Sequence, residues 1–203
     1  MKLFNELDPQ ENLLPFDGTL NYYGPIFFGN ECLQTFNTLL YSLDWKHDEV
    51  HMFGKRIITK RKFVWMADDS FPYTYGKIKR EASLWHPIVK EIKDKVEKIS
   101  NEKYNSCLLN LYPSGEEGMG WHSDAEHELE ANAAIASVSF EAVRKFALKH
   151  KKVEHKISLT LEDGSLLVMK DEIQTYWLHQ LPKSKSITTP RINLTFRTIK
   201  KTF

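Results

Sequence analysis

The stretch that decides the fold is Arg191-Ile192-Asn193-Leu194-Thr195-Phe196-Arg197, close to the end of the 203-residue chain. Its residues alternate between apolar and polar, and successive side chains of a strand point to opposite faces, so the stretch predicts a β-strand. On a half-exposed strand the polar face would simply meet water. Inside a barrel its two guanidinium groups would need counter-charge, because an unpaired buried ion is costly. A small dicarboxylate would supply that charge, since Arg binds carboxylate through paired hydrogen bonds.

We expect this strand to run over Arg191–Ile199, and period-two patterns upstream of it predict six more. Asp163-Gly164 separates two of them and is typical of a hairpin turn. Short strands with turn signals indicate an antiparallel sandwich or barrel. The six predicted strands are Tyr104–Tyr112, Ala134–Phe140, Arg144–Lys149, Val153–Leu161, Ser165–Lys170 and Tyr176–Leu181.

The first half of the chain is mixed. Its first 30 or so residues carry Pro and Gly between the hydrophobic residues and are expected to be loop-like. Apolar residues at helical spacing predict a helix over Glu31–Leu43 and a second over Trp85–Ile99, with Pro87 in its first turn. We expect both helices to pack on one outer face of the barrel, which gives an α+β fold with a mainly β core.

Composition excludes several classes of protein. The chain is 41% hydrophobic and 27% charged, which is typical of a folded globular protein and not of a disordered one. A net charge of +1 gives no support to nucleic-acid binding, so any such role must rest on local clusters. No long apolar run predicts a membrane span, and the first ten residues do not resemble a signal peptide. With only Cys32 and Cys107, we expect a soluble enzyme of a reducing cell interior.

Two histidines and an acid are candidates for a metal site. In His122-Ser123-Asp124 an extended backbone would turn the imidazole and the carboxylate to the same face, although a surface histidine beside an acid gives the same pattern. His179 lies in an apolar strand, where a histidine is either a core residue or a third ligand. Two His and one carboxylate with open positions is the facial triad of non-haem Fe(II) oxygenases. Zinc is the rival metal and would need a hydrolytic partner.

The order of these motifs resembles the AlkB family, on the branch with the animal homologues two and three. The resemblance covers residues 50 to 199. It rests on Asn110-Leu111-Tyr112, Trp121-His122-Ser123-Asp124, Ala136-Ser137-Val138-Ser139-Phe140, His179 and the Arg191–Arg197 stretch. The family consists of Fe(II)- and 2-oxoglutarate-dependent dioxygenases that repair alkylated nucleic acids. It implies a double-stranded β-helix, or jelly roll, with flanking N-terminal helices and a nucleotide-recognition lid.

The resemblance also implies roles for particular residues. His122, Asp124 and His179 would bind iron, and Arg191 would pair with the distal carboxylate of 2-oxoglutarate. Asn193 and Arg197 would hold the carboxylate end nearer the metal. Further co-substrate contacts are expected from Asn110, Tyr112 and Thr195.

Contacts to the nucleic acid are expected from residues 46 to 80. Lys55-Arg56-Ile57-Ile58-Thr59-Lys60-Arg61-Lys62 holds five cations in eight residues, which favours phosphate binding, with Lys55 and Arg61 as members; a solvated basic loop is the alternative. Phe53 would fill the gap left by a flipped base, and a buried hairpin Phe is the alternative. Trp65 and Tyr75 would stack on that base, although core packing explains them as well.

Other contacts lie outside this segment. Glu126 would accept a hydrogen bond from the exocyclic amine of the base. A longer phosphate track is expected from Arg144, Lys145, Lys149, Lys151 and Lys152.

The interpretation is oxidative demethylation of N1-methyladenine and N3-methylcytosine in DNA, with Fe(II), O2 and 2-oxoglutarate consumed and succinate, CO2 and formaldehyde released. An RNA demethylase, a protein or small-molecule hydroxylase, and a catalytically silent β-barrel binding module are the alternatives. We expect one domain over residues 1 to 203, with an extension to about residue 30 and a catalytic core over about 104 to 199. We also expect a monomer with no membrane contact, cytoplasmic in a bacterium or nuclear in a eukaryote.

Overall fold

The decisive strand, β13 (Arg191–Arg197), lies at the centre of the larger of two sheets. The computed structural model describes residues 8–52, 55–69, 72–75 and 78–200, and for residues 50–52, 55–57, 72–75 and 78–81 it describes the backbone only. All seven residues of β13 are buried, so the half-exposed alternative is wrong. Ile192, Leu194 and Phe196 have no exposed surface and face the helices, and each contributes roughly 1.5–3 kcal/mol through burial.

The larger sheet has seven strands in the order β1-β11-β8-β13-β6-β3-β2, and the smaller has four in the order β10-β9-β12-β7. Both are antiparallel, and β4 pairs with β5 in a separate hairpin. The remaining strands are β1 (Thr19–Pro25), β2 (Lys46–Met52), β3 (Lys55–Ala67), β4 (Pro72–Tyr75), β5 (Ile78–Glu81), β6 (Ser106–Tyr112), β7 (Met119–His122), β8 (Ile135–Glu141), β9 (Arg144–His150), β10 (Lys156–Leu161), β11 (Ser165–Lys170) and β12 (Trp177–Leu181).

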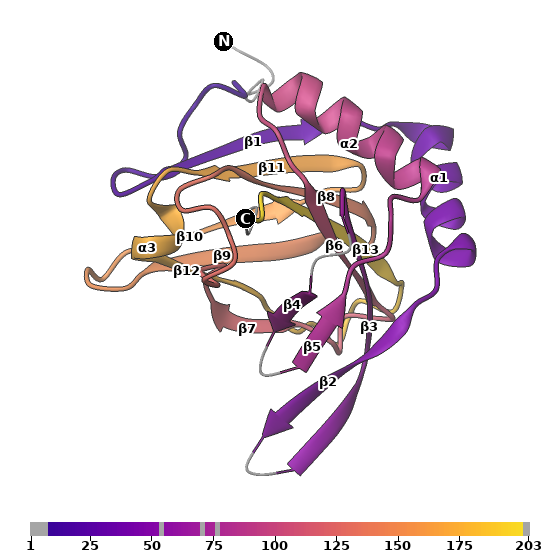
Figure 1. Ribbon diagram of the computed structural model, residues 1–203. Coiled ribbons are helices and arrows are strands. Elements are labelled where there is room, and N and C mark those ends of the chain that lie inside the picture. Colours follow the sequence, from indigo (N-terminus) through magenta and orange to yellow (C-terminus); the bar gives the residue numbers. More distant parts are fainter. Residues whose placement is uncertain (1–7, 53–54, 70–71, 76–77, 201–203) are drawn as a thin grey trace.

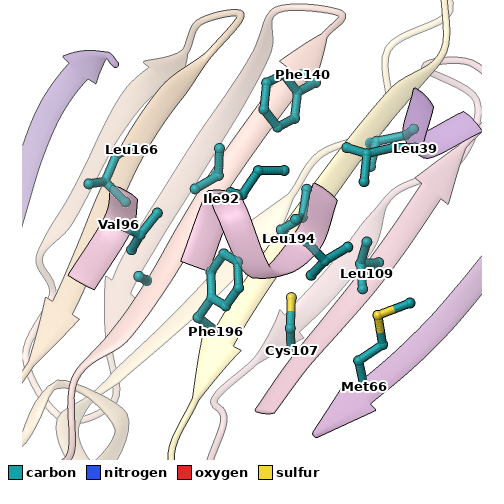
Figure 2. Packing of buried hydrophobic residues seen from close by; sticks show 14 of the residues in the cluster. Leu39, Met66, Ile92, Val96, Cys107, Leu109, Phe140, Leu166, Leu194 and Phe196 are labelled. Carbon is teal, nitrogen blue, oxygen red and sulfur yellow. The ribbon is translucent and has the colours of Figure 1, made fainter. Parts of the chain in front are cut away.

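Two longer helices cover the outer face of the larger sheet, as expected. They are α1 (Gly29–Ser42) and α2 (Pro87–Ser100), which lie together at one side of the molecule in Figure 1. Figure 2 shows Leu39 of α1 with Ile92 and Val96 of α2 directed onto the sheet residues Leu194 and Phe196. A third helix, α3 (Ile173–Tyr176), is a single turn before β12.

A second core fills the space between the two sheets. Leu148, Leu161 and Trp177 of the smaller sheet pack against Leu20 and Leu167 of the larger one. Sheets stacked with an apolar layer between them form the jelly-roll core that was expected. The hairpin of β2 and β3 projects away from this core, at the bottom of Figure 1.

Some expectations about local structure were wrong. The loop-like first 30 residues contain β1, which pairs with β11. The strand expected at Val153 starts at Lys156, because residues 151–154 bend. Asp163-Gly164 is not a hairpin turn, since β10 and β11 belong to different sheets. Gly164 has a φ of 70°, and its carbonyl accepts a hydrogen bond from the Ile26 backbone at 2.8 Å as the chain crosses between the sheets.

Candidate metal centre and co-substrate pocket

The two histidines meet because β7 and β12 are neighbours in the smaller sheet. His122 lies directly opposite His179 in the antiparallel register, and the two ring centroids are 4.2 Å apart. The Nδ1 atom of His122 lies 2.8 Å from the Gly120 carbonyl, to which it donates. The proton is therefore on Nδ1, and the lone pair of Nε2 is free to bind a metal. A backbone carbonyl commonly orients a metal-binding imidazole in this manner.

Asp124 completes the cluster two residues after His122. Its backbone amide donates to the Gln174 side chain at 2.9 Å, and its Oδ2 accepts from the Arg197 guanidinium at 2.8 Å. Its Oδ1 lies 3.9 Å from the Nε2 of His122. One ligand atom from each of His122, Asp124 and His179 lies within 4.8 Å of the other two, so the three side chains are placed to share one metal ion. Two imidazoles and a carboxylate suit ferrous iron.

The electrostatics of the cluster keep its ligands in the metal-binding form. Burial alone would raise the pKa of the Asp124 carboxyl, but the charge and hydrogen bond of Arg197, with smaller contributions from His179 and His122, outweigh burial and hold this pKa below its usual value. Burial lowers the pKa of His179 to about 4, although Asp124 opposes that shift. At neutral pH the site therefore contains an ionised carboxylate and a neutral His179, the forms that bind a metal.

This shift of His179 predicts how stability depends on pH in metal-free protein. The unfolded chain takes up the proton near pH 6.5, whereas the folded chain takes it up only near pH 4. Stability should therefore fall between pH 6.5 and 4, by up to about 1.4 kcal/mol per pH unit from this group, and be unaffected by it above pH 6.5. Urea unfolding with a chelator at several pH values measures the slope. His179→Gln should flatten it, and an identical slope in both proteins would contradict the assignment.

The polar face of β13 forms a pocket beside the metal cluster. Asn193 accepts from Ser137 at 2.9 Å and from Arg191 at 2.5 Å, and it donates to Thr195 at 2.8 Å. Arg191 also donates to Ser139 at 2.8 Å. These bonds fix the side chains in a row, as the alternation of the sequence predicted.

Arg191 is the residue whose environment most clearly calls for a ligand. It is 2% exposed, and its guanidinium bonds only to the neutral groups Ser139 and Asn193 in the part of the chain that the structure describes. Its Nε is buried without a partner among those residues. Burial lowers its pKa to about 10, so it stays charged at neutral pH. An anion with oxygens in one plane, such as a carboxylate, would satisfy this group.

One cavity of about 70 Å³ connects the metal cluster to this guanidinium. Its walls include Asn110 and Tyr112 of β6, whose side chains share a face as expected. The cavity suits a dicarboxylate with a keto group chemically, because metal ligands and a buried cation both line it. The expected residues that line it are His122, Asp124, His179, Asn110, Tyr112, Arg191, Asn193, Thr195 and Arg197.

A second cavity of about 240 Å³ adjoins the first, since Asp124 and Arg197 line both. Glu126 is on its wall, and the Oε2 of this residue is buried without a hydrogen-bond partner within the described part of the chain. A buried acceptor without a donor is costly, so this oxygen is suited to receive an N–H group from a ligand. The expected contact of Glu126 with the base stays a prediction.

The other expected substrate contacts have different outcomes. Trp65 is buried beside Leu129 and Ile199, which favours the core-packing alternative. Arg61 is not exposed to phosphate, because it is buried in an ion pair with Asp48 and donates to the Met119 sulfur at 3.2 Å. Phe53 and the side chains of Lys55 and Tyr75 lie outside the described residues.

Several residues that shape the site were not singled out from the sequence as contacts. Ser137 and Ser139 hold Asn193 and Arg191, and Gln174 of α3 holds the Asp124 backbone. The two serines were detectable as polar residues at alternate positions of an apolar strand. Gln174 had no such signal, because it reaches the site from 50 residues away.

A jelly-roll core with two His, one Asp and an arginine pocket in one cavity defines the class of 2-oxoglutarate and iron oxygenases. Residues 21–197 match the 2OG-Fe(II) oxygenase superfamily, and the chain belongs to that superfamily. Within it the chain is a member of the AlkB family, as its curated relatives and the sequence motifs both indicate.

The relatives include DNA oxidative demethylase ALKBH2 of Homo sapiens, 37% identical over 158 residues, which are 74% of this chain and 60% of that protein. Alpha-ketoglutarate-dependent dioxygenase alkB homolog 3 of Homo sapiens is 36% identical over 138 residues, 63% of this chain and 48% of that protein. The chain thus spans about half to two thirds of the length of these relatives. A solved structure titled "The structure of OsALKBH1" shares the fold, with a TM-score of 0.57, 13% identity and coverage of 91% of this chain and 98% of that one. No helix in the described ranges is long and apolar enough to cross a membrane.

Proposed function

We propose that the protein repairs DNA by oxidative demethylation of N-alkylated bases such as N1-methyladenine and N3-methylcytosine. Fe(II), O2 and 2-oxoglutarate would be used, and succinate, CO2 and formaldehyde released. The observation that carries the proposal is the single cavity joining the His122, Asp124 and His179 cluster to the buried guanidinium of Arg191. The named activity of the ALKBH2 relatives supports the choice of DNA as substrate.

The first task of the chain is to hold the metal. His122, Asp124 and His179 would bind Fe(II), and a ferrous ion held by three protein ligands would still be able to bind the co-substrate and oxygen. A bound ferrous ion supplies the oxidation of the N-methyl group, coupled to decarboxylation of 2-oxoglutarate. Arg197 keeps one Asp124 oxygen occupied at 2.8 Å, which directs the other oxygen toward the imidazoles.

The second task is to orient 2-oxoglutarate. Arg191 would pair with its distal carboxylate and relieve a buried, uncompensated charge. Asn193 and Arg197 would hold the end nearer the metal, with Asn110, Tyr112 and Thr195 completing the wall. All of these side chains are buried, so bulk water is kept away from the reacting groups.

The third task is to receive the flipped base. The cavity that contains Glu126 adjoins the metal cluster, and the unpartnered Oε2 of this residue would accept from the exocyclic amine. A base in a duplex must leave the stack to reach this position, at a cost of a few kcal/mol. Tyr75 would stack on the cationic lesion, and Trp65 would support the wall beneath it.

Contacts with the DNA backbone would come from the rim of the molecule. Lys60 is exposed, and Lys62 lies two residues further along β3. Lys149 lies with its ammonium 4.7 Å from the centre of the Trp121 ring, and Lys151 and Lys152 follow it. Such cations bind phosphate without reading sequence. We propose a monomer that works where genomic DNA is, in the nucleus of a eukaryote or the cytoplasm of a bacterium.

The choice of DNA over RNA predicts a role for Phe53. As an apolar wedge, it would matter only where a duplex gap must be filled. Phe53→Ala should lower the rate on methylated double-stranded DNA by about tenfold, since filling the gap offsets part of the unstacking cost, and should leave single-stranded DNA and RNA within twofold of wild type. Rates on the three substrates measure this, with Phe63→Ala in β3 as a hydrophobic control. Equal losses on all three substrates would rule out the wedge.

The activity is tested with a methylated oligonucleotide. The full chain is mixed anaerobically with Fe(II), 2-oxoglutarate and an oligonucleotide containing N1-methyladenine, and air is then admitted. Mass spectrometry should show the loss of one CH2 unit, with succinate formed in equal amount. Succinate formation with an unchanged oligonucleotide would instead indicate a protein or small-molecule hydroxylase. No succinate under any condition would indicate a silent binding module.

A further inference from the structure

Arg144, the first residue of β9, is a buried cation outside the site described above. It was expected on an exposed phosphate track, but only 1% of it is exposed, so that expectation was wrong. Its guanidinium donates to three backbone carbonyls, those of Ser114 at 3.4 Å, Glu117 at 2.9 Å and Pro182 at 2.8 Å. Burying a cation among neutral carbonyls costs desolvation free energy, because no opposite charge compensates it. We therefore ask what these contacts position.

The three carbonyls belong to two loops that flank the co-substrate cavity. Loop 113–118 connects the cavity residues Tyr112 and Met119, and loop 182–190 connects Leu181 and Arg191, which also line the cavity. Both ends of each loop are therefore part of the cavity wall. Arg144 bonds to both loops at once and fixes their separation.

The loops are also bonded directly to each other. The Gly115 amide donates to the Ile187 carbonyl at 2.8 Å, and the Ser184 amide donates to the Gly115 carbonyl at 2.7 Å. A Cβ added at Gly115 would lie 2.1 Å from the Ser184 carbonyl oxygen, so only glycine allows this approach. Together the two loops form one hydrogen-bonded layer, which is joined to the cavity wall at Tyr112, Met119, Leu181 and Arg191.

Tyr112 links this layer to the co-substrate pocket. The guanidinium carbon of Arg144 lies 6.0 Å from the centre of the Tyr112 ring, and that of Arg191 lies 5.6 Å from the same centre. After burial, the charge of Arg144 is a further cause that lowers the pKa of Arg191. Arg144 and Arg191 thus both lie near the ring of Tyr112, and the positive charge of each would attract an anion bound in the cavity.

We propose that Arg144 is a positioning residue for 2-oxoglutarate: it holds the two loops and Tyr112 in place so that Arg191 meets the distal carboxylate. This inference rests on the proposed function, because it assumes that the cavity binds 2-oxoglutarate. Among the described residues, the guanidinium of Arg144 donates to loop carbonyls and to none of the three metal-binding side chains. Its loss should therefore change co-substrate affinity and spare metal binding and the maximal rate.

The test is a calorimetric titration of 2-oxoglutarate into the full chain loaded with Mn(II), for wild type, Arg144→Lys and Arg144→Gln. Arg144→Gln should weaken binding on the order of tenfold, because it removes a positive charge near the cavity and breaks the hydrogen bonds that hold the two loops. Arg144→Lys keeps the charge but loses the planar fork, so it should lie between wild type and Arg144→Gln. Mn(II) affinity and the rate at saturating 2-oxoglutarate should stay within twofold.

Lys145→Gln is the matched control. It removes the same charge from the exposed residue next to Arg144 and should leave 2-oxoglutarate binding unchanged. Gly115→Ala leaves Arg144 in place but pushes the two loops apart, so it should also weaken 2-oxoglutarate binding. This variant replaces Arg144→Gln in the test if Arg144→Gln does not fold. Wild-type affinity in folded Arg144→Lys and Arg144→Gln would overturn the inference, as would an equal loss of Mn(II) binding. If wild type itself does not bind 2-oxoglutarate, the proposed function fails and the inference fails with it.

Discussion

Asp124→Ala is expected to reduce succinate formation by about three orders of magnitude, equivalent to about 4 kcal/mol in the activation barrier. The carboxylate is the single anionic ligand in the cluster, and the variant leaves two neutral imidazoles to hold a divalent cation. It also removes a carboxylate that pairs with the Arg197 guanidinium, so less negative charge offsets this cation beside the metal. Succinate formation and metal content after dialysis measure the two effects.

The control for this variant is Asp94→Ala, which removes an exposed carboxylate paired with Lys90 on α2 and should leave both quantities unchanged. Circular dichroism establishes that the Asp124 variant is folded. Wild-type succinate formation in a folded Asp124→Ala protein would show that the metal is held elsewhere.

Arg191→Met is expected to have the second large effect. It should weaken 2-oxoglutarate binding, but it should not lower the stability of the protein without co-substrate. With 2-oxoglutarate bound, the charge pair would be lost, which costs about 3–5 kcal/mol or at least a hundredfold in affinity. Without co-substrate, the variant removes a buried cation that bonds only to Ser139 and Asn193 among the described residues, so its stability should equal or exceed that of wild type.

Thermal unfolding with and without 2-oxoglutarate measures both signs. Wild type should be stabilised by the co-substrate to a degree set by the ratio of its concentration to the dissociation constant, and Arg191→Met should not respond. Arg197→Met is a useful comparison, because it leaves Asp124 unpaired and should destabilise the protein in both conditions. A co-substrate response in Arg191→Met equal to that of wild type would contradict the role given to Arg191.

The central strand shows what the sequence could predict. Alternation in Arg191–Arg197 assigned each side chain to the correct face, because the period of two is a property of the backbone alone. Burial of both faces could not be read from the strand. It depends on α1 and α2 on one side and on the smaller sheet on the other, which are contacts between distant parts of the chain.

Arg61 shows why local charge is a weak guide. Five cations in eight residues indicated a phosphate patch, but β2 pairs with β3 and brings Asp48 to Arg61. The register shifts between His47 and Glu49, so Asp48 lies in an irregular part of the ladder, where a side chain can be redirected. The burial of Arg144 could not be predicted either, because its acceptors are backbone carbonyls, which every residue type has.

The ligand set could be predicted because its chemistry is specific. Two histidines, an aspartate and an arginine-bearing strand in a fixed order are compatible with few kinds of site besides a ferrous centre with an anionic co-substrate. The Asp163-Gly164 dipeptide is less specific, because the same two residues can form a hairpin turn or a connection between two sheets. Only the partners of β10 and β11 decide between these two.

The most direct test of the proposed site is an anaerobic titration of Fe(II) and 2-oxoglutarate into the purified chain. We predict one equivalent of each per chain, with 2-oxoglutarate binding weakened at least a hundredfold in Arg191→Met and metal binding lost in Asp124→Ala. Metal that binds equally well to Asp124→Ala, or 2-oxoglutarate that binds equally well to Arg191→Met, would contradict the site.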